Sequence, residues 1–192
     1  MRKPFFPVGL NLDGRVCVVI GAENDREAIA KTAALRESGA EVRRVTDPQR
    51  VRDEDVAEAF FVVSTPQDEA LSQRLRALAD RHRFLLCCID QPAYGFVAMA
   101  AIAKAGPVRI AISTAGLAPR VGKALKQGLQ RAMDARFGRF VERLAQMREA
   151  ERARHPRPEE SPIRRKAMIE AADGFSADVR FTFPAWFDDG ER

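Results

Sequence analysis

The first 114 residues alternate short stretches of strand character with segments of helical spacing. Strands are expected at five places that are bounded by turn-forming residues, namely residues 15–22, 41–47, 59–65, 84–89 and 108–114. The fourth of them, FLLCCI, is an unbroken apolar run, which is typical of a parallel strand buried on both faces. The hydrophobic pattern therefore predicts a sheet with a buried interior.

Helices are expected between these strands. Residues 25–40 and 68–83 place apolar side chains at helical spacing, and Gly39 would end the first of these helices. Residues 96–106, FVAMAAIAKAG, indicate a short apolar helix. Strands that alternate with helices at this interval predict an α/β fold, with a Rossmann-like, doubly wound parallel sheet of about five strands.

Beyond the last expected strand the pattern becomes helical. Residues 117–154 form a long basic amphipathic segment that runs to the breaker HPRPEESP, and Pro119 is suited to its first turn. A further helix is expected at 163–173. An acidic, aromatic stretch over 181–192 ends the sequence, and its phenylalanines and Trp186 are expected to pack over the helices.

Composition is that of one globular core with room for a small appendage, since the chain has 192 residues. No apolar run approaches the ~20 residues that span a bilayer, and the short, Pro-broken start does not resemble a signal peptide. A cytoplasmic protein without a membrane partner is therefore expected. Cys17, Cys87 and Cys88 lie in expected strands without metal-binding spacing, so they are predicted to be core residues, and no resident metal is expected.

Charge is concentrated in one part of the chain. Residues 104–166 contain 16 Lys and Arg against 6 Asp and Glu, whereas the preceding residues are almost balanced. Such a block can be a solvated helical face, a nucleic-acid footprint or a site for a polyanionic small molecule. Its aromatic residues Phe137 and Phe140 are three apart, which indicates a core position rather than base stacking. No nucleic-acid partner is therefore expected.

One carboxylate stands out as a candidate catalytic base. Asp90 directly follows the apolar run over 84–89, where such a strand would emerge at its carboxyl end, and open α/β sheets bind ligands at that edge. Asp also opens turns, and Pro92 follows closely, so a role in capping that turn stays open.

The turn after the first strand matches a dinucleotide-binding unit only in part. Such units need GxGxxG or GxGxxA, but residues 21–28 are GAENDREA, so only the first glycine is kept. Glu23 and Asp25 add negative charge where a diphosphate should bind, which predicts weak NAD binding. Asn24 can adopt a left-handed turn, and Asp47 can accept hydrogen bonds from a ribose. The cofactor-binding residues expected on this basis are Gly21, Ala22, Asn24, Asp25, Arg26, Asp47, Pro48 and Thr65.

Five segments together resemble one family: PFFPVGLNLDGRVCVVIG, ALRESGAEV, AFFVVST, RALADRHRFLLCCIDQP and GPVRIAISTAGLAPRVGKALKQ. The family is that of precorrin-2 dehydrogenase/sirohydrochlorin ferrochelatase, also found as the N-terminal part of siroheme synthase, and the similarity covers about residues 4–140. The resemblance implies an NAD-binding Rossmann domain over 1–107, a swapped dimerisation segment over 108–145 and a small helical domain over 146–192. It therefore implies a homodimer.

The resemblance also implies two reactions in one cleft. Precorrin-2 would be oxidised to sirohydrochlorin with NAD, and ferrous iron, as a substrate, would then be inserted to give siroheme. The family's aspartate, thought to act as base in the oxidation and to assist chelation, falls on Asp90. The family's serine- and glycine-rich turn falls on Ser113, Thr114, Ala115 and Gly116, where Ala115 replaces a usual glycine.

The departures from the family pattern fall mainly on the cofactor side. The glycine turn has about two extra residues, and the third strand is followed by Thr65-Pro66 in place of Thr-Asp or Thr-Asn. Cys87 stands where Asn is usual, and Ala100 where Pro is usual. These changes affect the dehydrogenase activity more than the fold.

The chemistry of both reactions suits one carboxylate and a basic surface. Each reaction strips protons from the same macrocycle, so one well-placed base suffices. The substrate's carboxylates give the basic residues around Thr114 a role, and the predicted substrate-binding set is Ser113, Thr114, Gly116, Arg120 and Lys123, with Arg109 and Lys126 nearby. Three interpretations stay open: a working dehydrogenase with or without chelatase activity, a chelatase or tetrapyrrole carrier that has lost NAD, and an interaction module on a Rossmann-like fold.

Overall fold

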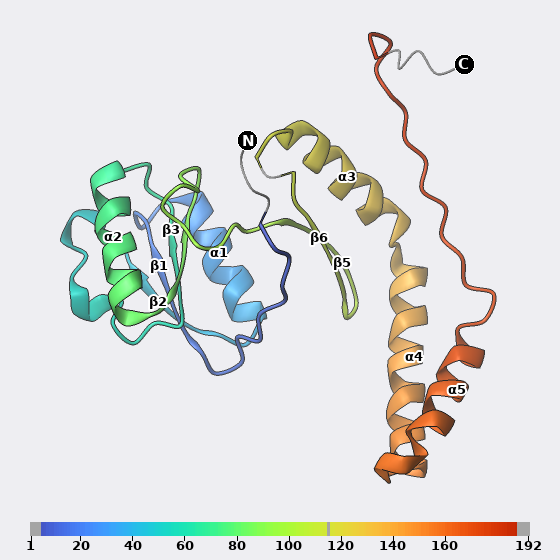
Figure 1. Cartoon of the computed structure of the whole chain (residues 1–192). Helices are drawn as coiled ribbons and strands as arrows, with labels where there is room; N and C mark the ends of the chain where they lie inside the picture. The colour runs from blue at the N-terminus through green and yellow to red at the C-terminus, as the bar shows by residue number, and fades with distance from the viewer. Residues whose placement is uncertain (1–4, 115, 188–192) are drawn as a thin grey trace. The chain divides into compact units, whose positions relative to one another are not determined.

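A computed structural model describes residues 5–114 and 116–187 (Figure 1). The chain divides into two compact units. The first comprises Met1–Ala101 and Ala111–Ala124, and the second comprises Ile102–Ile110 and Leu125–Arg192. None of the described helices has the length and apolar content needed to cross a bilayer.

The first unit is built on a four-stranded parallel sheet in the order β2-β1-β3-β4. The strands are β1 Val16–Ile20, β2 Glu41–Val45, β3 Phe61–Ser64 and β4 Leu85–Cys88. The register places Ile20 opposite both Val45 and Ser64, and Ser64 opposite Cys88. All four strands therefore end at one edge of the sheet, and the first four expected strands are confirmed.

Two helices cover the opposite faces of this sheet, as Figure 1 shows for α1 (Arg26–Glu37) and α2 (Glu69–His82). Alternate residues of each strand enter two apolar clusters because successive side chains in a strand point to opposite faces. The cluster under α1 contains Ala28, Leu35, Cys17, Val19 and Cys87. The cluster under α2 contains Leu71, Leu75, Val18, Ile20 and Cys88. The three cysteines are buried core residues, as expected.

The prediction of a helix over 96–106 is wrong. The prediction that the fifth strand joins the parallel sheet is wrong as well. β5 (Ala101–Ala105) and β6 (Val108–Ile112) form a separate two-stranded sheet. The amides of Phe96 and Val97 both donate to Leu86 O, at 2.8 and 3.0 Å, so they are committed to the edge of β4 and do not start a helix. The connection of two residues at Gly106, where φ is +50°, makes β5 and β6 neighbours in a hairpin.

The long basic segment is two helices instead of one. α3 (Pro119–Ala132) ends before Asp134, whose side chain caps α4 (Ala135–Arg154) by accepting from Phe137 N at 2.9 Å. Pro119 does occupy the first position of α3, where its missing N–H costs nothing. In the second unit Gln130 bonds to both the N–H and the C=O of Lys104, at 3.1 and 2.8 Å, and so extends the β5 edge with a side-chain amide.

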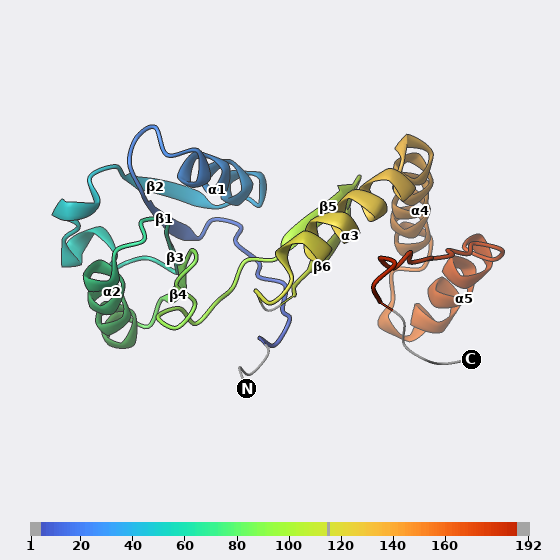
Figure 2. The ribbon, with the colours of Figure 1, turned by 90° about the horizontal axis from the view of Figure 1, so that it is seen from above.

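The helix expected near 163–173 is confirmed as α5 (Ser161–Ala171), which lies beside α4 in Figure 1 and Figure 2. Phe137 and Phe140 pack against Phe175, with ring centroids 6.1 and 5.3 Å apart. Both are only partly buried and Phe175 is 54% exposed, so the expected core position is met only in part. The packing expected of the tail aromatics is wrong. Trp186 is 81% exposed, and Phe181 and Phe183 are mostly exposed as well, because the described tail residues contact mainly each other.

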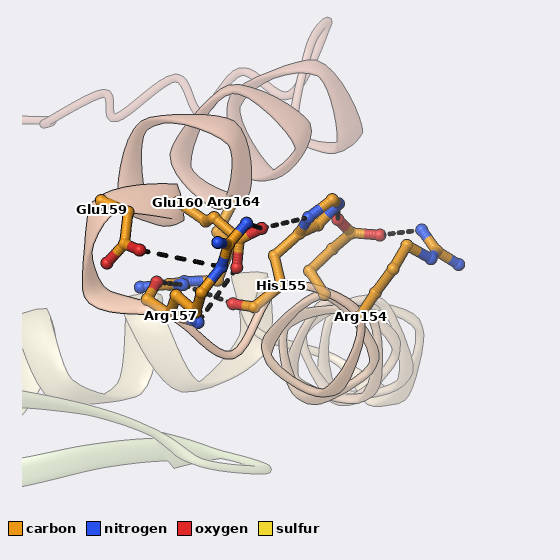
Figure 3. A network of polar contacts seen from close by, with 7 residues as sticks. Arg154, His155, Arg157, Glu159, Glu160 and Arg164 are labelled. Carbon is orange, nitrogen blue, oxygen red and sulfur yellow. Dashed lines mark hydrogen bonds and ion pairs between the residues drawn. The ribbon is translucent and has the colours of Figure 1, made fainter.

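The link between α4 and α5 is held by charged groups (Figure 3). Arg164 donates to the carbonyls of His155 and Arg157, at 2.5 and 2.8 Å. Arg157 pairs with Glu160 at 3.1 Å and lowers the pKa of that carboxyl. The expected breaker therefore ends α4 at Arg154 and turns the chain through the 3-10 turn Pro158–Glu160.

Candidate functional site

The carboxyl edge of the parallel sheet brings together the turns that follow β1, β3 and β4. Gly21 follows β1, Thr65 and Gln67 follow β3, and Asp90 follows β4. This is the edge at which open α/β sheets bind ligands. The parallel register places these turns at the same edge.

Gly21 is required by packing. A Cβ at this position would lie 2.3 Å from Thr65 Oγ1 and 2.8 Å from Ala28 Cβ. Its amide donates to Val45 O at 3.0 Å, which continues the pairing of β1 with β2. Only glycine therefore lets α1 and the β3 turn approach the end of β1 this closely.

Asp25 is the N-cap of α1, and both of its oxygens are engaged. Oδ1 accepts from the amides of Glu27 and Ala28, at 2.9 and 3.4 Å, and Oδ2 lies 2.5 Å from Thr65 Oγ1. The hydrogen bond from Thr65 is the main cause that lowers the pKa of the Asp25 carboxyl, and the two amides and Arg44 lower it further, against the effect of burial. The carboxylate is therefore held in its charged form.

Arg44 is a residue of this turn that sequence reasoning missed. Its NH2 group donates to the carbonyls of Gly21 and Ala22, at 3.0 Å each, and so fixes the backbone between β1 and α1. Its Nε is buried without a partner among the described residues. The sequence does contain a signal for Arg44, since Arg43 and Arg44 lie inside an expected strand. A cation in a strand must find carbonyl or carboxylate partners.

The remaining residues of the expected cofactor set lie around the same edge. Ala22, Asn24 and Arg26 are exposed in the turn, where Asp25 N donates to Ala22 O at 3.0 Å. Asp47 caps the 3-10 turn Pro48–Arg50 by accepting from Gln49 N at 3.2 Å. The close strand-to-helix turn at Gly21 suits a dinucleotide. Two first-turn amides of α1, those of Glu27 and Ala28, do not suit its diphosphate, because Asp25 already occupies them.

Asp90 is exposed in the turn after β4, with φ at +59°. Asp tolerates this left-handed conformation better than most residues. Within the described part of the chain, its carboxylate accepts one hydrogen bond, from Gln67 Nε2 at 3.2 Å, and no backbone amide. Gln67, which sequence reasoning also missed, therefore orients the carboxylate while leaving most of its acceptor capacity open.

The segment after Asp90 is fixed to α2 and to β4. Gln91 Oε1 accepts from Ser72 Oγ at 2.6 Å, and the Arg76 guanidinium lies 3.8 Å from the centroid of the Phe96 ring. A Cβ on Gly95 would lie 3.0 Å from Leu86 O, so a glycine is needed for this close approach. These contacts hold the backbone that carries Asp90 in one place.

Cys87 does not supply the polar group that the family usually has at its position. It is 2% exposed on the α1 side of the sheet, and burial raises the pKa of its thiol to about 11. The thiol is therefore protonated and adds no charge to the site.

The expected substrate-binding residues cluster in the turn before α3. Leu117 N donates to Thr114 O at 2.9 Å, Gly116 has φ of +76°, and the buried Gly122 lies against Thr114. Ser113 is exposed, and Ala115 lies outside the described residues. The described residues give no contact between this turn and Asp90, so a shared tetrapyrrole site stays a prediction.

Two cations lie exposed at the start of α3. Arg120 and Lys123 are exposed on the first turns of α3, and among the described residues neither forms an ion pair. No group of three or more His, Cys, Asp or Glu residues in the described part is arranged to hold a metal.

Comparison with known proteins identifies relatives of this chain. A family model described as "Putative NAD(P)-binding" matches residues 8–101. The siroheme synthase of Xylella fastidiosa is 34% identical over 169 residues, which cover 79% of this chain and 35% of that protein. The siroheme synthase of Hahella chejuensis is 24% identical and matches 92% of this chain and 41% of its own length. The chain thus spans less than half the length of these relatives.

A shorter relative matches over most of its own length. The precorrin-2 dehydrogenase of Bacillus subtilis is 32% identical over 110 residues, which cover 57% of this chain and 67% of that protein. A solved structure named "SirC, precorrin-2 dehydrogenase" superposes with a TM-score of 0.65 at 20% identity, over 88% of this chain and 90% of that one, and so shares the fold. Taken with the match over residues 8–101, these similarities establish that the chain belongs to the precorrin-2 dehydrogenase/siroheme synthase N-terminal family and carries its NAD(P)-binding domain.

Proposed function

We propose that this protein oxidises precorrin-2 to sirohydrochlorin with NAD, in siroheme biosynthesis. Family membership and the shared fold support the proposal. The observation that carries it is Asp90, an exposed carboxylate at the ligand-binding edge of the sheet that Gln67 orients. The activities of the much longer siroheme synthases are not needed for this proposal.

In the proposed reaction Asp90 takes a proton from the tetrapyrrole. A carboxylate with open acceptor positions can do this as soon as the substrate lies within hydrogen-bond reach. Arg120 and Lys123 would bind substrate carboxylates, since both are exposed and neither forms an ion pair among the described residues. NAD, when bound, supplies the hydride acceptor.

A second candidate is a chelatase or tetrapyrrole carrier that does not use NAD. The capping of the α1 amides by Asp25 favours it, because this capping removes the usual diphosphate site. Insertion of ferrous iron, a substrate here, also requires removal of pyrrole protons, so Asp90 would serve as the base in this case as well.

The test of the proposal is Asp90→Asn, which keeps the shape and tolerates φ of +59° but cannot act as a base. We expect oxidation of precorrin-2, followed by absorbance, to fall by at least about 10²-fold with the melting temperature unchanged. Gln67→Met, which removes the orienting bond, should lower turnover by a smaller factor. Glu58→Gln, an exposed change at the opposite end of β3, is the matched control. A fully active Asp90→Asn protein would exclude Asp90 from the mechanism.

We also propose that residues 108–145 pair two subunits, with the Rossmann domain over 1–107 and a helical domain over 146–192. The high amphipathicity of α3 and the exposed Val121 on it support this proposal. Sedimentation at micromolar concentration should show a dimer, and a monomer would contradict the proposal.

A further inference from the structure

We propose that Asp25 is an internal competitor of the dinucleotide diphosphate, held in place by Thr65, and that it sets the NAD affinity of this protein. The inference deepens the proposed function and rests on it only for the identity of the ligand. It concerns binding and can be tested without the oxidation reaction.

The Asp25 carboxylate occupies amides at the N-terminus of α1. The N-terminus of a helix binds phosphate because its first amides have no partner within the helix and carry partial positive charge. In α1 the amides of Glu27 and Ala28 both donate to Asp25 Oδ1, at 2.9 and 3.4 Å. A phosphate oxygen bound to the same amides would have to lie where Asp25 Oδ1 lies.

The Asp25 carboxylate is also held from its other side by Thr65. Thr65 Oγ1 lies 2.5 Å from Asp25 Oδ2, which joins the start of α1 to the end of β3. A Cβ on Gly21 would lie 2.3 Å from Thr65 Oγ1 and 3.0 Å from Asp25 Oδ2, so the three residues are in tight contact. Asp25 is therefore a packed part of the turn, and a ligand must displace it or bind beside it.

The charges at this turn also disfavour a bound diphosphate. A diphosphate beside an ionised Asp25 meets a like charge. Arg44 donates through its NH2 group to the carbonyls of Gly21 and Ala22, at 3.0 Å each, and its Nε is buried. Two amides at the positive end of α1 are already paired with Asp25. The expected consequence is weak NAD binding with an identifiable cause.

The test is titration calorimetry of the full chain with NAD. In Asp25→Gly the occupant is removed, while glycine is still an accepted N-cap residue. We expect NAD to bind about tenfold more tightly to this variant than to the wild type. Asp25→Asn removes the charge but keeps the acceptor on the amides, so its gain should be smaller. Thr65→Val, which releases Oδ2, should also give a gain.

Two controls isolate the diphosphate site. Glu23→Gln removes one negative charge from the same turn without freeing an amide, so the NAD affinity should not change. Adenosine, which has no phosphate, should bind equally to wild type and Asp25→Gly. A cooperative thermal transition above the titration temperature shows that each variant is folded.

The NAD titrations of these variants distinguish the inference from its alternatives. Tighter NAD binding by Asp25→Gly, with no change for Glu23→Gln or adenosine, supports the inference. Tight NAD binding by the wild type, no gain in Asp25→Gly, or an equal gain in Glu23→Gln overturns it. If NAD binding improves but precorrin-2 is still not oxidised, the inference stands and the proposed function fails.

Discussion

At the scale of single residues, two carboxylates differ in what they leave open to a ligand: Asp25 accepts from two amides and from Thr65, whereas Asp90 accepts from Gln67 and is exposed. Asp90 could be singled out from its position after an apolar strand, and the structure places it at the expected edge. Gln67 and Arg44 could not be singled out, because their partners are distant in sequence and depend on the sheet register. The sequence also showed that Asp25 adds charge to the turn, but not that it caps α1 and contacts Thr65.

The lowered pKa of Asp25 predicts a pH dependence of stability. A carboxyl whose pKa falls below its ordinary value of 3.8 on folding stabilises the protein above that value, and this stabilisation is lost as the pH falls through the folded-state pKa. We expect the free energy of unfolding of the wild type to exceed that of Asp25→Asn at neutral pH. The difference should shrink below about pH 4, as measured by urea denaturation. A difference that is independent of pH would contradict the assignment.

At the scale of elements, the pattern predicted the four parallel strands and the helices between them because each has its own hydrophobic period. It failed at 96–106, where a run of alanines and small apolar residues suits a helix as well as a strand. The bonds of Phe96 and Val97 to Leu86 O decide the outcome there, and they are tertiary contacts. The break between α3 and α4 was missed for a different reason, since Asp134 can lie within a helix or cap one.

The strand-to-helix turn predicts a costly substitution. Gly21→Ala would place a methyl group 2.3 Å from Thr65 Oγ1 and 2.8 Å from Ala28 Cβ, so α1 or the β3 turn must move. We expect a loss of roughly 1–3 kcal/mol in the free energy of unfolding, measured with urea. The matched control is Gly9→Ala, because a Cβ there has no neighbour within 4 Å. Equal stability of the two variants would show that the turn is less tightly packed than described.

At the scale of the whole molecule, charge is divided along the chain, and the basic part begins after the parallel sheet. The composition alone left a solvated face, a nucleic-acid footprint and an anion site open. The structure shows that Arg120 and Lys123 are exposed at the start of α3, without ion pairs among the described residues. Their assignment to the tetrapyrrole depends on how the site is assembled, which no local pattern encodes.

The exposed cations predict a salt-dependent affinity. Arg120→Ala or Lys123→Ala should weaken tetrapyrrole binding, and the loss should be larger at low salt, where screening is least. Fluorescence titration at two ionic strengths measures both effects. Lys166→Ala in α5 removes the same charge from the far end of the sequence and should have little effect. Unchanged affinity in the α3 variants would show that Arg120 and Lys123 belong to an ordinary solvated face.

The bonds from Phe96 and Val97 to Leu86 also bear on aggregation. An open sheet has two edge strands, and unpaired edges recruit strands from other molecules. Here β4 is shielded by the chain that follows Asp90, while β2 carries Glu41, Arg43 and Arg44. Neither border of the sheet is therefore a flat apolar template. The close approach at Gly95 that fixes the backbone next to Asp90 thus also prevents the sheet from growing by addition of foreign strands.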